Sequence, residues 1–192
     1  MLGRTHEIVA VGSVVSAAIL FPQQNITTET AVLSIMVAML GGLAPDLDKP
    51  GSKIWDKIPA GGILSRIVNP IFIGGHRHLT HSILGVVLFS MGVKALLNIM
   101  PLGPTTSVSI IFSSFVIAFV SHLVADMLTK DGVPLLFPLP FHFGLPPFEF
   151  MRMRTNGWIE NLLVTPGVVA AVAALVYLYP NNAKSLAGLL GM

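Results

Sequence analysis

Residues 107–128 read SVSIIFSSFVIAFVSHLVADML, and this stretch decides the fold class. It belongs to a longer run, residues 95–125, that contains no Asp, Glu, Lys or Arg. Two similar charge-free runs occupy residues 8–28 and 161–183. A helix needs about 20 apolar residues to cross a bilayer, so all three runs are long enough. The pattern predicts an integral membrane protein.

The overall composition supports the same interpretation. Of the 192 residues, 53% are hydrophobic and only 10% are charged, whereas soluble domains average about 25% charged residues. The chain has no cysteine, which excludes disulfides and cysteine-ligated zinc sites. A formal charge of +2 is too small to indicate a nucleic-acid partner. The apolar composition indicates membrane lipid as the expected partner. We expect one domain over residues 1–192.

The apolar runs and their proline breaks predict an all-α, polytopic membrane bundle of about five helices. No small-residue cleavage site follows the first run, so we expect it to be a retained span. Two long loops, residues 46–75 and 129–160, separate the spans. The five expected spans are residues 6–21, 31–44, 79–100, 107–128 and 161–179.

Positive charges gather in the two long loops. The short loops at 22–30 and 101–106 contain no Lys or Arg. The positive-inside rule therefore places the N-terminus and both long loops in the cytoplasm. The long loops carry Lys49, Lys53, Lys57, Arg66, Arg77, Lys130, Arg152 and Arg154.

This topology brings every candidate ligand to one membrane face. Polar and ionisable side chains near a bilayer are costly unless they are paired, and they usually mark functional sites. We expect several helix ends to converge there on a single site. The residues are His6, Asp46, Asp48, His76, His78, His81, His122, Asp126 and Glu160.

Two pairs in this set have spacing that suits metal binding. His122 and Asp126 are four residues apart on a helix, so they share a face. Both could bind one metal ion, or Asp126 could orient His122 as the ligand. Asp46 and Asp48 are placed to chelate or bridge ions, and the glycines before them let another helix approach closely. Without a metal, His122 and Asp126 would be a polar pair at a helix end that hydrogen-bonds a neighbouring helix. Asp46 and Asp48 would then lie in a solvated loop.

The run His76-Arg77-His78-Leu79-Thr80-His81 supplies further candidates. His76 and His81 can point the same way, and Arg77 has the forked donors that bind phosphate or carboxylate. We expect Thr80 to cap the following helix. A basic cluster that contacts lipid headgroups is the alternative.

A ligand set of His and Asp suits a divalent metal, with zinc favoured and manganese also fitting. There are more candidates than one tetrahedral ion uses, so two or more ions are plausible. A two-metal site would clamp a phosphoryl group and activate water.

The second long loop bears on the substrate. Between residues 131 and 151 it contains five prolines and five phenylalanines. The prolines argue against a sixth span. The phenylalanines are either ordinary interfacial aromatics or a lid or acyl-chain groove over the metal site. Arg152 and Arg154 follow them and are candidates for holding an anionic headgroup.

In their order along the chain, several motifs resemble the YdjM-type family of inner-membrane, metal-dependent hydrolases, which is distantly similar to the zinc phospholipase C and P1 nuclease group. The resemblance covers roughly residues 1–165. The motifs are TH at 5–6, GLAPDLD at 42–48, HRHLTHS at 76–82, SHLVAD at 121–126 and GVPLL at 132–136.

The resemblance implies a location in the inner (plasma) membrane, and Asp48 as a ligand or an orienting group. His78 departs from the family pattern, where a small residue is common, so we do not assign it as a ligand. The metal ligands that the resemblance implies are His6, Asp46, His76, His81, His122 and Asp126.

The expected function is a membrane hydrolase that cleaves a phosphoester or other ester of a lipid or lipid-linked substrate with metal-activated water. The candidate catalytic residues are Arg77, to stabilise developing charge, with Asp48 and Glu160. Two rivals remain open. One is a metal or proton-coupled transporter, and the other is a structural membrane protein whose metal pins helices together.

Overall fold

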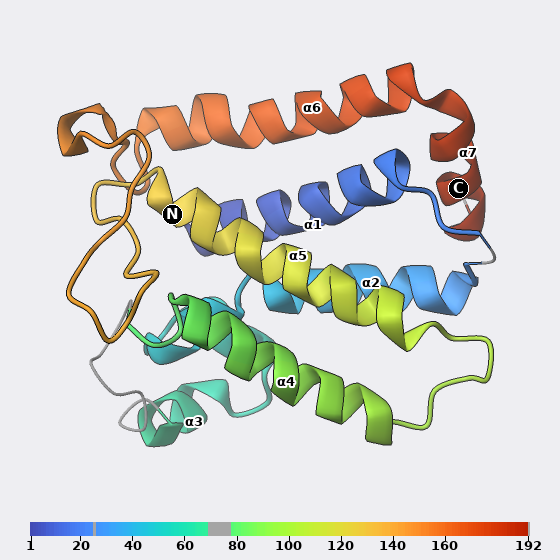
Figure 1. Ribbon diagram of the computed structural model, residues 1–192, viewed down its shortest axis with the longest axis horizontal. Coiled ribbons are helices and arrows are strands. Elements are labelled where there is room, and N and C mark those ends of the chain that lie inside the picture. The colour runs from blue at the N-terminus through green and yellow to red at the C-terminus, as the bar shows by residue number, and fades with distance from the viewer. Residues whose placement is uncertain (25, 69–77, 192) are drawn as a thin grey trace.

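The computed structural model describes residues 1–24, 26–68 and 78–191. The described residues are helical and form no β-strand, apart from the isolated bridges Thr129–Met153 and Val133–Phe143. The all-α prediction is therefore confirmed for this part of the chain. Its α-helices are α1 Gly3–Leu20, α2 Thr28–Gly41, α3 Gly61–Val68, α4 Ile83–Ile99, α5 Val108–Met127, α6 Thr165–Leu178 and α7 Pro180–Leu189 (Figure 1).

Helix α5 is the centre of the bundle. It packs against α1, α2 and α4, whereas α6 packs on the outer side of α1 (Figure 1). Phe115 and Phe119 of α5 are buried, and the ring of Phe89 of α4 packs against Phe119 at a tilt of 44°, with 5.5 Å between the ring centroids. No residue of α6 is buried. The apolar stretch that decides the fold class therefore forms the core that the other helices surround.

Two helices are long and apolar enough to cross a membrane by length and composition: α5, and the continuous helix Glu160–Leu178. The latter joins α6 to the π-helical turn η5, Glu160–Val164. Helices α2 and α4 are apolar but have only 14 and 17 residues. The described residues thus contain two such helices, fewer than the five spans that we expected.

The shorter helices end where local chemistry favours another conformation. After α2 the chain turns into the 3₁₀ helix η1, Ala44–Asp48, which begins near Pro45. Helix α4 begins at Ile83 rather than near residue 79, because the Ser82 hydroxyl accepts from the Gly85 N–H at 3.1 Å and caps it. The prediction that Thr80 caps this helix is wrong.

The two long loops fold against the same end of the bundle. The described part of the first contains the end of η1, the 3₁₀ turn η2 (Trp55–Lys57) and α3, so residues 46–68 are more ordered than a simple loop. It is tied to α1 because Lys53 and Lys57 both pair with the largely buried Glu7. The second contains one short 3₁₀ turn, η4 (Glu149–Met151), and no sixth span, as its prolines predict.

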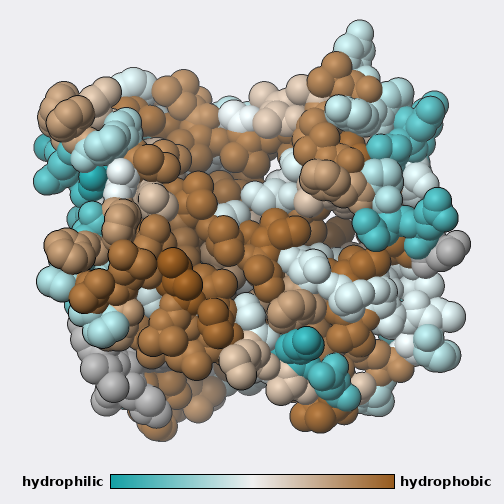
Figure 2. Space-filling view, viewed as in Figure 1, coloured by the Kyte–Doolittle hydropathy of each residue, from teal (hydrophilic) through white to brown (hydrophobic). Residues whose placement is uncertain are grey.

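The surface pattern suits a chain embedded in lipid. Hydrophobic residues cover the middle of the face in Figure 2, and hydrophilic residues gather mainly towards the two edges where helices end. Many large apolar side chains are exposed on α2, α4 and α6, including Met36, Met91 and Val169. Such a broad exposed apolar surface is unusual for a protein surrounded by water.

Candidate metal centre

Five of the six predicted metal ligands lie together in the protein interior. His6, His81, His122 and Asp126 are almost completely buried, and Asp46 is 8% exposed. They form two groups that share His122: His6, His122 and Asp126, and Asp46, His81 and His122. In each group one ligand atom from every residue lies within 4.8 Å of the others. The sixth predicted ligand, His76, lies outside the described residues.

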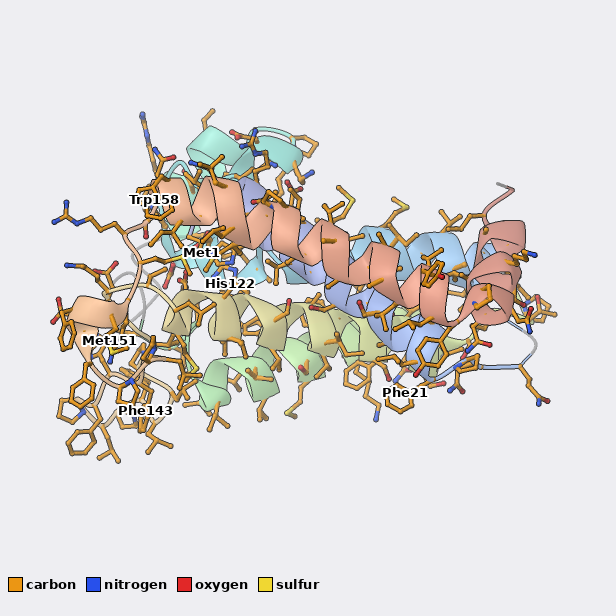
Figure 3. All side chains as sticks on the ribbon, turned by 90° about the horizontal axis from the view of Figure 1, so that it is seen from above. Met1, Phe21, His122, Phe143, Met151 and Trp158 are labelled. Atoms are coloured by element: carbon orange, nitrogen blue, oxygen red, sulfur yellow. The ribbon has the colours of Figure 1, made fainter. Side chains whose placement is uncertain are left out.

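Four separate elements position these side chains. His6 comes from the first turns of α1, Asp46 from η1, and His81 from the turn before α4. His122 and Asp126 lie one turn apart near the end of α5, and both point into the cluster, as their spacing predicts. Figure 3 shows His122 and Met1 at the same end of the bundle as Met151 and Trp158, whereas Phe21 lies at the opposite end.

Two glycines allow these elements to approach. A Cβ on Gly41 would lie 3.0 Å from the Phe115 carbonyl oxygen of α5. A Cβ on Gly42 would lie 2.4 Å from Ala10 Cβ of α1. The prediction that these glycines let other helices come close is confirmed. They bring α1 and α5 to the segment that carries Asp46.

Hydrogen bonding fixes the ring of His122. Its Nδ1 lies 2.7 Å from the carbonyl oxygen of Gly42. A carbonyl can only accept, so Nδ1 carries the proton and donates. The other nitrogen, Nε2, then has a free lone pair in the neutral ring. This arrangement is typical of a metal-binding histidine that a backbone carbonyl orients.

A second hydrogen-bonded chain fixes His81 in the same way. The Thr80 hydroxyl donates to Asp48 Oδ2, and its oxygen lies 2.9 Å from His81 Nδ1. Because Thr80 has used its only proton, it accepts from His81 Nδ1. Nε2 of His81 is therefore also left with a lone pair.

The two Nε2 atoms face each other at 3.3 Å. A tetrahedral zinc ion that binds two imidazoles at about 2.0–2.1 Å would hold their nitrogens about 3.3–3.4 Å apart. Carboxylate oxygens surround the pair. Asp46 Oδ1 lies 3.8 Å from His81 Nε2, and Asp126 Oδ2 lies 3.7 Å from the same atom. With both Nδ1 atoms acting as donors, the two Nε2 lone pairs and the nearby carboxylates form a donor set that fits a divalent metal.

His6 extends the cluster on the other side of His122. Its ring stacks on the His122 ring at 3.6 Å, with 14° between the planes. Its Nε2 lies 3.2 Å from Asp126 Oδ1, which also accepts from the amino group of Met1. His6 Nδ1 is buried and has no hydrogen-bond partner among the described residues. A buried nitrogen without a partner is costly, so His6 has an unused hydrogen-bonding or ligand atom inside the cluster.

The predicted catalytic residues take different positions. Arg77 lies outside the described residues. Asp48 is on the Nδ1 side of His81, at 3.7 Å, so it orients that ring rather than facing the other ligands. Glu160 is buried, and its oxygens accept from the Leu2 and Asn156 N–H groups, each at 2.7 Å. Its catalytic role stays a prediction that this geometry does not support.

Two other polar residues that the sequence analysis named as candidates, His78 and Arg152, make contacts with the second long loop. His78 lies outside both groups, and its ring contacts Phe137 edge-on at 6.1 Å. Arg152 clamps the second loop, because its Nε donates to the Pro146 carbonyl at 2.9 Å and its Nη2 to the Pro147 carbonyl at 2.8 Å. These bonds occupy the guanidinium that we expected to hold an anionic headgroup. Arg154 is exposed.

Sequence reasoning missed the supporting partners of the site. The supporting roles of Thr80, the Gly42 carbonyl and Glu7 with its two lysines were not predicted, although Thr80 and Gly42 lie within the motifs at 76–82 and 42–48. The available signals were a threonine directly before a candidate ligand, and a glycine pair directly before Asp46.

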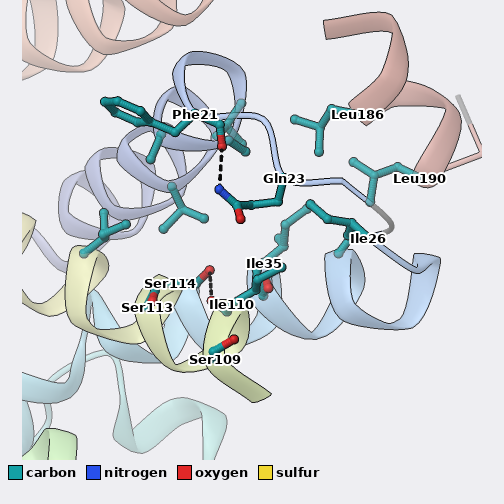
Figure 4. Close-up of a pocket in the computed structure, with 17 residues that line it drawn as sticks. Phe21, Gln23, Ile26, Ile35, Ser109, Ile110, Ser113, Ser114, Leu186 and Leu190 are labelled. Atoms are coloured by element: carbon teal, nitrogen blue, oxygen red, sulfur yellow. Dashed lines mark hydrogen bonds between the residues drawn. The ribbon is translucent and has the colours of Figure 1, made fainter. Parts of the chain in front are cut away.

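The opposite end of the bundle contains a cavity of about 340 Å³ between α1, α2, α5 and α7 (Figure 4). Its polar lining consists of Gln23 and four serines, and no ionisable side chain is among the described residues that line it. The clustered imidazoles and carboxylates are therefore specific to one end.

Comparisons with known proteins show which protein family this chain is similar to. The sequence profile described as YdjM inner membrane protein matches residues 1–188. The chain is 30% identical over 164 residues to the uncharacterized protein YvsG of Bacillus subtilis, covering 85% of this chain and 88% of YvsG. It is 38% identical over 112 residues to the inner membrane protein YdjM of Escherichia coli, covering 57% of this chain and 51% of that protein.

No solved structure matches the chain. The profile covers nearly the whole sequence, and YvsG aligns over most of both chains. The buried His/Asp cluster lies within the matched residues. The chain belongs to the YdjM inner membrane protein family.

Proposed function

We propose that this protein is a multi-pass, metal-dependent hydrolase of the inner membrane that cleaves a phosphoester or other ester of a lipid or lipid-linked substrate. The metal centre lies at the cytoplasmic face, together with the N-terminus and the two long loops. The observation that carries the proposal is the pair of facing Nε2 atoms on His81 and His122, each held by a hydrogen bond at Nδ1.

The donor set favours zinc, with manganese as the alternative, since imidazole and carboxylate suit both. Asp46, His81 and His122 would hold one ion, and His6 with Asp126 would provide ligands for a second. An ion here supplies a Lewis acid that polarises a phosphoryl or carbonyl oxygen and activates water. His122 belongs to both groups, so its fixed ring sets their relative position.

The remaining residues support the reaction from outside the donor set. Asp48 and Thr80 keep the proton of His81 on Nδ1, which holds Nε2 ready as a ligand. Burial of the cluster excludes bulk water and strengthens every electrostatic interaction within it. Arg77 stays our candidate for binding the anionic part of the substrate.

Metal content tests this function most directly. We expect the purified protein to contain one or two equivalents of a divalent metal and to hydrolyse bis(4-nitrophenyl) phosphate. His81→Ala should lose metal and hydrolysis, because it removes a donor that faces His122 Nε2. His78→Ala is the matched control, since that histidine lies outside both groups, and it should retain both properties. Equal metal content in all three proteins would refute the centre.

One observation also favours a structural metal. The donors come from four separate elements, so an ion would pin α1, η1 and α5 together. A protein with this role would lose thermal stability when the metal is removed and would hydrolyse no ester in the presence of metal. Hydrolysis that depends on added metal excludes a purely structural role.

A further inference from the structure

An apolar groove begins beside the metal centre. It lies between α1, α5 and α6 and has a volume of about 510 Å³. At one end it is lined by Met1 and Ala125. The amino group of Met1 donates to Asp126, and Ala125 directly precedes Asp126 in the chain. The groove and the candidate metal centre therefore share a border.

The groove runs along α5 away from the metal centre. Its lining extends from Leu128 back to Val116, twelve residues or roughly 18 Å along a helix. One leaflet contributes about 15 Å to the hydrocarbon thickness of a bilayer. The groove is therefore long enough for one chain of a lipid that lies in the leaflet next to the metal centre.

The walls of the groove suit a hydrocarbon chain. Apart from Met1, the lining carries no ionisable group, and its polar side chains are those of Ser13 and Ser121. The Ser121 hydroxyl donates to the Ala118 carbonyl of its own helix at 2.8 Å, so it is already satisfied.

One side of the groove is closed by helix packing, and the other is open. A Cβ on Gly12 of α1 would lie 2.6 Å from Val168 Cγ1, so α1 and α6 are in direct contact there. Val120 and Val124 of α5 line the groove and are 41% and 48% exposed. A chain can therefore enter sideways, from the lipid.

We propose that this groove binds one hydrocarbon chain of a long-chain phosphate ester and places its phosphate at the metal centre. This inference rests on the proposed hydrolase function and names its substrate class. Burial of the long chain supplies binding energy that grows with the number of buried methylenes, and it sets the position of the head. Esters with short alkyl groups reach the same centre without that contribution.

Val116→Phe tests the groove, because it fills the deep end about 9 Å along the helix from His122. The matched control is Val169→Phe on α6, an exposed valine that does not line the groove.

The probes are 4-nitrophenyl hexadecyl phosphate and 4-nitrophenyl butyl phosphate, with protein in phosphatidylcholine nanodiscs. We expect V116F to lower kcat/KM for the hexadecyl ester about tenfold or more. The butyl ester and the metal content should not change, and V169F should match the unsubstituted protein.

Failure of the groove and failure of the hydrolase are distinguishable. If both esters are hydrolysed and V116F affects them equally, the groove is refuted and the hydrolase stands. If neither ester is hydrolysed, the hydrolase is refuted, and binding of radiolabelled hexadecyl phosphate decides the groove. Weaker binding to V116F, but not to V169F, supports it. Equal binding to all three proteins overturns it.

Discussion

The two ends of the helical bundle are built from the same helices and hold different chemistry. At one end α1 and α5, with the segment after α2 and the turn before α4, bury three histidines and the carboxylates of Asp46 and Asp126. At the other end α1, α2 and α5 line a cavity whose polar groups are hydroxyls and one amide. The difference arises from a few residues near the helix ends, not from the packing of the helices.

The contrast bears on the choice between hydrolase and transporter. A transport pathway for metal or protons needs polar groups along the whole route, because a charge in an apolar passage is strongly disfavoured. Among the described residues, ionisable donors gather at one end, and the cavity at the other end has no ionisable side chain in its lining. A reaction at one membrane face needs only the first end, so the contrast favours hydrolysis.

The largest expected effect comes from Asp126→Ala at the metal end. Asp126 Oδ1 lies 3.2 Å from His6 Nε2, and its Oδ2 lies 3.8 Å from His122 Nε2, so this carboxylate contacts both other members of its group. Its loss leaves buried cationic and imidazole groups without a partner, which costs about 3–5 kcal/mol. We expect loss of bound metal and a lower unfolding temperature. The measurements are metal analysis and thermal unfolding in detergent, and unchanged metal content would contradict the assignment.

Thr80→Val should have an intermediate effect at the same end. Valine keeps the shape of the side chain but removes the hydroxyl that accepts from His81 Nδ1 and donates to Asp48. Loss of such an orienting partner typically weakens metal affinity roughly 10–100-fold. Competition with a chromophoric chelator measures that affinity. Thr80→Ser restores the hydroxyl and should restore the affinity; equal weakening in both variants would show that the hydroxyl does not orient His81.

Helical periodicity and the expected topology together predicted which residues the structure brings into one cluster. His122 and Asp126 had to share a face of α5, and the topology placed His6, Asp46 and His81 near them. The failures concern groups whose conformation depends on tertiary contacts. Ser82 rather than Thr80 caps α4, because Thr80 is held by Asp48. No local signal reveals such a contact.

The number of spans could not be predicted for a related reason. Apolar composition in α2 and α4 indicates burial in lipid or in protein, but it does not fix where a helix ends. Pro45, the glycines before it and the Ser82 cap shorten these helices to 14 and 17 residues. The partner of a charged side chain is equally hard to predict from the sequence. We expected Arg152 to bind an anionic headgroup, but it donates to backbone carbonyls of its own loop instead.

The smallest expected effect is at the opposite end, where Ser34→Ala tests whether that cavity is inert. Ser34 lines the cavity, and its hydroxyl is buried without a hydrogen-bond partner among the described residues. Removing an unsatisfied buried hydroxyl should raise the free energy of unfolding by up to about 1 kcal/mol. Ser114→Ala is the matched control, because the Ser114 hydroxyl donates to the Ile110 carbonyl at 2.9 Å and its removal should be neutral or destabilising. Thermal unfolding and metal analysis would measure both variants, and neither should change metal content. If Ser34→Ala instead destabilises the protein more than Ser114→Ala, the Ser34 hydroxyl has a polar partner in the cavity, and the two ends differ less in chemistry than the contrast requires.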